Sequence, residues 1–231
     1  MRCVKLGELP FLLFVFCVML LTSPRAHAEQ KKEKNVCFRW AFAAMVGSED
    51  DRRLLSITGD TTLRTGDKLK LLVEPQNKCF VYLIYHSGQD DILMLFPYEL
   101  EQFTTDYKTS KKYFIPQGTI WFELDEKVGI ETFYLFASAT RLVELEALFK
   151  KHTSEGAVDK QKRAQQVLTQ IRKIKRRYRT LTTSAERPVS IGGSVRGNNK
   201  YRELAPPDFY ATATEVSAHN FYSRTFTIEH Q

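Results

Sequence analysis

The chain has 231 residues, and its 34 Lys and Arg against 27 Asp and Glu give a formal net charge of +7. Hydrophobic residues make up 43% of it, which is the composition of a folded protein and excludes a disordered chain. No repeat of about 20–50 residues is present, so solenoid and propeller folds are excluded as well.

The first 28 residues have the pattern of a secretory signal peptide. Arg2 and Lys5 supply a positive start, Phe11–Leu21 an apolar core, and residues 26–28 (Ala-His-Ala) the small residues of a cleavage site. The apolar run is too short to span a bilayer, which needs about 20 residues. We therefore expect cleavage after Ala28, export to the periplasm or the exterior, and no transmembrane segment in the mature chain.

Removal of the signal peptide would leave 203 residues with a net charge of +5 and two cysteines, Cys37 and Cys79. A single pair of cysteines in an exported protein is a candidate disulfide. The alternative is two buried free thiols, because both cysteines lie in apolar, strand-like surroundings where cysteine serves as a small hydrophobic residue.

The mature chain opens with a polar leader at residues 29–35, and Val36–Val46 has the aromatic, alternating character of a strand. Residues 54–138 then carry the pattern of an all-β domain, in which Pro97 ends a strand and 98–112 is a polar loop. Strands are expected at 67–74, 78–86, 91–96, 113–116, 120–124 and 131–138.

The spacing of apolar residues changes to that of helices after residue 140. It predicts a short helix over 141–151 and a long one over about 158–181. The long helix has one apolar stripe, and its remaining surface is basic, with Asp159 as its one acid. The basic residues are Lys160, Lys162, Arg163, Arg172, Lys173, Lys175, Arg176, Arg177 and Arg179.

Three more strands are expected near the C-terminus, at 187–196, 208–217 and 221–230. A helical segment between strands favours one domain over two. We therefore predict a mainly β, sandwich-like domain over residues 36–231, with about eight to ten strands and two helices packed against it.

Several short sequence motifs occur together in a characteristic order. They are Leu63–Asp67 (LRTGD), Val81–Leu83 (VYL), Leu95–Pro97 (LFP), Phe114–Pro116 (FIP), Gly129–Thr132 (GIET) and Ala137–Ser138. Together they resemble a bacterial domain of unknown function, family 4384, which is found on exported proteins. The resemblance covers about residues 54–151. It implies a β-rich fold and, because that family has no established activity, it implies no catalytic residues.

The sequence contains no recognisable catalytic or metal-binding constellation. The histidines of the mature chain are dispersed, and its two cysteines are too far apart for a zinc-binding spacing. Glu123, Asp125 and Glu126 follow Trp121, as in some sugar-binding subsites of glycosidases, but the same pattern suits an exposed strand. We expect no cofactor, no metal and no enzymatic activity.

The basic helix is the one segment with a distinct functional prediction. Its dense positive charge could contact a polyanion or a membrane surface. The residues expected to make this contact are Arg172, Lys173, Lys175, Arg176, Arg177 and Arg179. Export argues against nucleic acid, and the aromatic interleaving of single-strand binders is absent.

The favoured function is thus an exported, non-catalytic binding or interaction module. Its partner would be a protein or another component of the cell envelope. A binder of envelope polyanions or membrane surfaces through the basic helix is the alternative, and an exported hydrolase is the third candidate.

Overall fold

The computed structural model describes residues 35–48, 51–89, 91–154, 159–179, 184–188 and 209–231. All of them belong to one unit, Glu33–Gln231. The signal peptide expected at residues 1–28 and the leader that follows it, up to residue 34, lie outside the described part of the chain.

Seven strands form the first sheet, called sheet A here. Its main order is β10-β11-β1-β4-β7, with β2 paired to β1 and β8 paired to β4, and every pair is antiparallel. The strands are β1 (Asn35–Val46), β2 (Arg53–Ser56), β4 (Lys68–Pro75), β7 (Tyr113–Ile115), β8 (Phe122–Glu123), β10 (Ser184–Pro188) and β11 (Thr214–His219).

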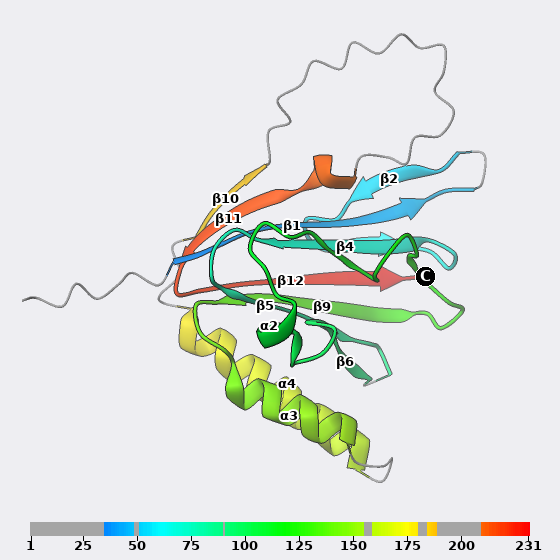
Figure 1. Cartoon of the computed structure of the whole chain (residues 1–231). Coiled ribbons are helices and arrows are strands. Elements are labelled where there is room, and N and C mark those ends of the chain that lie inside the picture. The colour runs from blue at the N-terminus through cyan, green and yellow to red at the C-terminus, as the bar shows by residue number, and fades with distance from the viewer. Residues whose placement is uncertain (1–34, 49–50, 90, 155–158, 180–183, 189–208) are drawn as a thin grey trace, which may run out of the picture. The chain divides into compact units, whose positions relative to one another are not determined.

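Five strands form the second sheet, sheet B, in the order β3-β12-β9-β5-β6. Only the pairing of β12 with β3 is parallel. The strands are β3 (Thr61–Leu63), β5 (Phe80–His86), β6 (Ile92–Phe96), β9 (Gly129–Ser138) and β12 (Phe221–His230). The two sheets lie face to face (Figure 1).

The main core lies between the two sheets, because alternate residues of each strand point inward. On β1 these are Val36, Phe38, Trp40 and Phe42, all buried. Trp40 meets Phe226 of β12 edge to face with ring centroids 5.1 Å apart. The mainly β, sandwich-like class expected from the sequence is confirmed.

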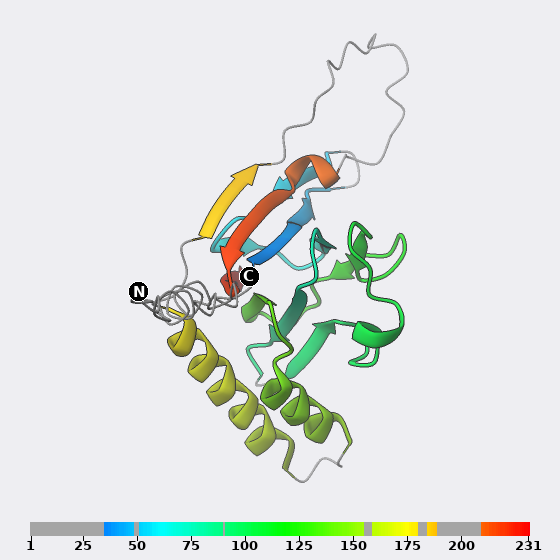
Figure 2. The ribbon, with the colours of Figure 1, turned by 60° about the vertical axis from the view of Figure 1, so that its left-hand side comes forward.

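Two helices, α3 (Val143–Ser154) and α4 (Lys160–Tyr178), cover the outer face of sheet B, side by side (Figures 1 and 2). The apolar stripe of α4 packs there, with Val167, Ile171 and Ile174 buried against residues such as Phe136 and Phe221 of the sheet. This packing fixes which side of α4 faces the solvent.

A buried polar network fastens α3 to the sheet. The Tyr82 hydroxyl of β5 donates to Oε1 of Glu146 at 2.6 Å and accepts from the backbone N of Leu142 at 2.9 Å. Arg141 donates to the same carboxylate through Nε and Nη2. The carboxylate and the phenol are thereby both satisfied away from water, which such buried groups require.

Several element boundaries differ from the sequence-based expectation. The long helix spans Lys160–Tyr178 rather than about 158–181, and the loop expected at 98–112 contains a one-turn helix, α2 (Gln102–Thr105). The segment expected as a strand at 208–217 begins as a 3-10 helix, η2 (Phe209–Thr212), before β11. Of the strand expected at 187–196, only residues 187 and 188 are described, as the end of β10 (Ser184–Pro188), which begins earlier than expected; the rest lies outside the described residues.

The candidate disulfide between Cys37 and Cys79 is absent, and both residues are free thiols. Cys37 lies on the outer side of β1, with its Sγ 3.8 Å from Oγ of Ser217. Cys79 is buried in the core between the sheets, where its Sγ donates to the carbonyl oxygen of Cys37 at 3.6 Å. A disulfide requires side chains that point toward each other, whereas these lie on opposite sides of one strand. Burial raises the pKa of the Cys79 thiol to about 12.

A lysine is buried on the outer face of sheet A. Lys70 of β4 is 6% exposed, and its Nζ donates to the carbonyl oxygens of Gly118 and Ile120 at 2.8 and 2.6 Å. The rings of Phe114 and Trp121 lie 5.7 and 5.6 Å from the ammonium. The lysine thus ties the connection between β7 and β8 to the sheet.

Candidate anion-binding site

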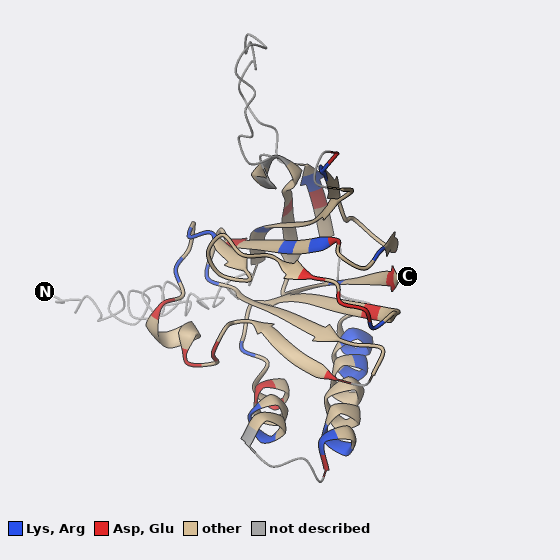
Figure 3. Cartoon of the chain, turned by 90° about the vertical axis from the view of Figure 1, so that its right-hand side faces the viewer, with Lys and Arg blue, Asp and Glu red and all other residues tan. Residues whose placement is uncertain are grey.

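The six cations singled out in the sequence all lie in the last two turns of α4 or directly after it. Five of them, Arg172, Lys173, Arg176, Arg177 and Arg179, are exposed, whereas Lys175 is half-buried. Figure 3 shows these positive charges on α4, below the sheets. The i, i+4 spacing of a helix divides them into rows with different surroundings.

One row faces α3 and meets an acid there. Nζ of Lys173 is 3.6 Å from Oε2 of Glu144, and Nε2 of Gln170 donates to that same oxygen at 2.8 Å. These contacts, with Arg177 nearby, lower the pKa of the Glu144 carboxyl, and the hydrogen bond from Gln170 is the largest cause. Part of the positive charge on this side is therefore offset.

The other row lines a groove of about 440 Å³ between α4 and the outer face of sheet B. Its cations are Arg172, Lys175, Arg176 and Arg179, and Tyr134 of β9 faces them across the groove. Ser223, Ile171 and Tyr178 complete the lining. Among the described residues, no carboxylate belongs to this lining, so four positive charges share the groove.

Lys175 is the most enclosed cation of the groove. Its Nζ donates to Oγ1 of Thr225 on β12 at 2.7 Å and lies 5.7 Å from the centre of the Tyr134 ring. Burial lowers the pKa of this ammonium group. An ammonium has three N–H donors, and within the described residues Thr225 takes one of them, so two remain for a ligand.

A second hollow, of about 640 Å³, lies along the exposed crest of α4. It is lined by Thr169, Arg172, Lys173, Arg176 and Arg177. Arg172 and Arg176 line this hollow as well as the groove, so one ligand could contact both. The two hollows form a continuous cationic surface, which we call the α4 basic surface.

The first half of α4 is less available than the sequence suggested. Lys160 pairs with Asp91, with Nζ and Oδ1 2.5 Å apart. Arg163 was expected on the solvent side but is 6% exposed. The helix turns this position toward the packed face, so most cations of α4 that have no acidic partner among the described residues lie in its second half.

Two other hollows carry both signs of charge. A groove of about 650 Å³ between β6 and α3 has Glu101 and Lys150 among its lining, and these two form an ion pair at 3.1 Å. A hollow of about 550 Å³ beside α2 has Asp106 and Lys111, paired at 2.5 Å. Neither hollow presents the uncompensated charge found beside α4.

The carboxylates considered for a hydrolase do not converge on one point. Glu123 pairs with Lys68 at 3.0 Å, and Oδ1 of Asp125 accepts a hydrogen bond from the backbone N of Lys127. Trp121 lies against Lys70, on the outer face of sheet A. A search of the described residues finds no group of three or more His, Cys, Asp and Glu placed to hold a metal ion.

None of the helices in the described ranges combines the length and the hydropathy needed to cross a membrane.

The sheet side of the groove was not anticipated from the sequence. Tyr134, Ser223 and Thr225 come from β9 and β12, which pair along their whole lengths and place Tyr134 opposite Thr225. Their outward direction follows from the alternation of each strand. Their proximity to α4 depends on tertiary packing, which a single sequence does not show.

Comparison with known proteins gives one match. No curated protein and no solved structure matches the chain. Residues 62–141 match the family model described as "Domain of unknown function (DUF4384)". The matched segment runs from β3 to the loop before α3, so α4 and the last strands lie outside it. This segment of the chain is therefore similar to the DUF4384 family.

Proposed function

We propose that this protein is an exported, non-catalytic binding module whose ligand is a polyanion of the cell envelope, bound by the α4 basic surface. The observation that carries the proposal is a groove whose described lining holds four cations and no carboxylate. Arginine side chains bind carboxylates and phosphates bidentately and keep their charge at all physiological pH values, so such a surface is suited to anions.

The way in which α4 packs supports binding through charge rather than insertion into a bilayer. An interfacial helix buries its apolar face among the lipids. In α4 that face is already covered by sheet B, with Val167 and Ile171 buried. What the helix offers to solvent is mainly basic. The ligand would therefore be held by ion pairs, and binding would weaken as salt is added.

The alternatives have less support. A hydrolase needs convergent acids, bases or nucleophiles, and the described carboxylates Glu123 and Asp125 serve in an ion pair and a turn. A protein partner remains an alternative for the groove between β6 and α3, whose balanced charges give no preference for anions.

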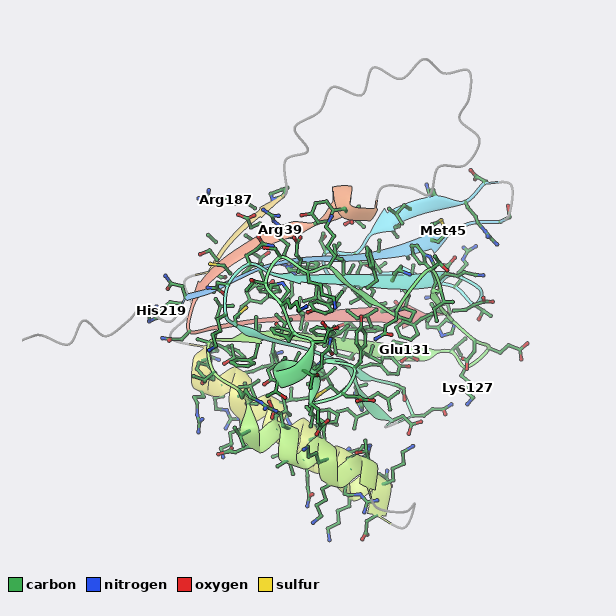
Figure 4. The ribbon with its side chains drawn as sticks, viewed as in Figure 1. Arg39, Met45, Lys127, Glu131, Arg187 and His219 are labelled. Atoms are coloured by element: carbon green, nitrogen blue, oxygen red, sulfur yellow. The ribbon has the colours of Figure 1, made fainter. Side chains whose placement is uncertain are left out.

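Heparin chromatography across a series of salt concentrations tests the proposal. The full-length protein should be retained, and R172Q/R176Q should elute at clearly lower salt. For this variant, the slope of log affinity against log salt concentration should also fall by about two, which is about one for each lost contact. The matched control is R53Q/K127Q, which removes the same amount of charge far from α4. Arg53 lies on β2, and Lys127 lies in the loop before β9 and is labelled in Figure 4.

The control variant should elute with the wild type. The proposal is wrong if charge reversal of Arg172, Lys173, Arg176 and Arg177 together leaves heparin retention unchanged in a protein that still unfolds cooperatively.

A further inference from the structure

Within the groove, Lys175 occupies a position unlike that of the exposed cations around it. Its stem passes between α4 and sheet B, and its ammonium is held by the Thr225 hydroxyl at 2.7 Å. A side chain fixed in this way loses little rotational freedom when it binds a ligand. Because the side chain is half-buried, its charge is partly desolvated. No acid among the described residues forms an ion pair with it, so those residues supply no counter-ion.

Three arginines stand along the helical wall of the same groove. Arg172, Arg176 and Arg179 follow one another at intervals of four and three residues and so share a side of α4. The rise of a helix places successive members about 6 and 4.5 Å apart along the axis. No ion pair links any of the three to an acid in the described ranges. Their guanidinium groups can therefore turn toward one anion seated beside Lys175.

The groove combines one fixed ammonium group with the planar guanidinium groups of arginines. Lysine acts on a phosphate as a point charge, and arginine binds it bidentately. The hydroxyl of Ser223 adds a neutral donor from the sheet side. Four cations favour an anion with more than one negative charge. A phosphate monoester carries about −1.5 to −2 at neutral pH, whereas a phosphodiester or a sulfate ester carries only one charge.

We infer that the groove between α4 and sheet B is a binding site for a phosphate monoester group, with Lys175 as its central contact. The inference rests on the proposed function and deepens it, because it separates one specific subsite from the general attraction of the α4 basic surface. The phosphate could belong to a phosphorylated sugar or to a lipid headgroup. Both present the same chemistry to the groove.

Calorimetric titration of the full-length protein with glucose 6-phosphate tests the inference. The test variant is K175M, which keeps an unbranched stem in contact with Tyr134 but has no donors. The matched control is K162M, which removes the same charge from an exposed position in the first half of α4, outside the lining of both hollows. We expect the dissociation constant to rise at least about tenfold in K175M and to stay within about twofold in K162M.

Two further arms identify the chemistry and the source of the phosphate. Glucose 6-sulfate should bind much more weakly than the phosphate ester. Affinity for the phosphate should fall as the pH drops through about 6, where the ester takes up its second proton.

Vesicles containing phosphatidic acid, compared with phosphatidylcholine alone, test the lipid source. Binding to these vesicles without binding to the sugar phosphate would assign the site to a lipid.

The failure of this inference can be told apart from failure of the proposed function. Equal losses in K175M and K162M, or equal affinity for the phosphate and sulfate esters, would overturn the subsite while heparin retention still supported a general polyanion surface. Absence of binding to both phosphate sources would overturn it too. If the wild-type protein is not retained on heparin at all, the proposed function itself is wrong.

Discussion

A buried or half-buried lysine lies at the outer face of each sheet, Lys70 on β4 itself and Lys175 on α4, and the two lysines differ in how completely their donors are used. On sheet A, Lys70 donates to two carbonyl oxygens and is bracketed by the rings of Phe114 and Trp121. At sheet B, Lys175 of α4 donates to one hydroxyl, that of Thr225, and has one ring beside it. Burial lowers the pKa of both ammonium groups.

The difference separates a structural role from a binding role. The partners of Lys70 are backbone carbonyls of the protein itself, so this lysine is nearly saturated and enclosed. Lys175 opens into a groove where its neighbours are other cations. Two side chains with the same chemistry thus serve opposite purposes, and the number of donors left over distinguishes them.

The largest expected effect concerns the saturated lysine. In K70M the carbonyl oxygens of Gly118 and Ile120 lose their donor inside a covered site, at a cost of about 1–3 kcal/mol for each group left unsatisfied. We expect the free energy of unfolding to fall by about 2–4 kcal/mol, as measured by urea denaturation. The control K68M removes the half-buried partner of the exposed Glu123 and should cost at most about 1 kcal/mol. Equal losses in the two variants would contradict the structural role of Lys70.

A smaller effect is expected at the unsaturated lysine. K175M removes one hydrogen bond and also a poorly compensated charge, and these changes oppose each other. The free energy of unfolding should therefore stay within about 1 kcal/mol of the wild type while phosphate binding is lost. A destabilisation as large as that of K70M would place Lys175 among the structural residues and erase the contrast between the two sheets.

The smallest effect is a dependence of stability on pH. Because burial lowers the pKa of Lys70 and Lys175, the native state releases their protons at a lower pH than the unfolded state, whose lysines titrate near 10.5. Between those pH values the unfolded state binds more protons, so stability rises with pH. Urea denaturation at about pH 8 and pH 10 should show the wild type gaining stability relative to K70M/K175M. Parallel pH profiles of the two proteins would contradict this expectation.

Long, regular elements could be predicted from the sequence. The strand at Phe221–His230 was expected with these same bounds, because its alternation runs over ten residues. β2 and β3 were not expected as separate strands, since four and three residues are too few to establish a period of two. The one-turn helix α2 was missed for the same reason.

The site was predictable only on its helical side. The rows of cations follow from the spacing along α4, whereas Thr225 and Tyr134 reach the groove through contacts that join distant parts of the chain. The cysteine pair teaches a different lesson. Val36 and Phe38 face the core, so the alternation of β1 already places Cys37 on the opposite side from it.

The position of β12 has a consequence for the order of folding. This strand is the last in the chain, yet it pairs with β9 over its full length and supplies Phe226 and Ile228 to the core. β11 likewise completes sheet A by pairing with β1, about 180 positions earlier in the sequence. Neither sheet is complete until β11 and β12 have been synthesised, and pairings between such distant segments form slowly. The nascent chain would accordingly keep both sheets incomplete through most of its synthesis and add β11 and β12 to them late.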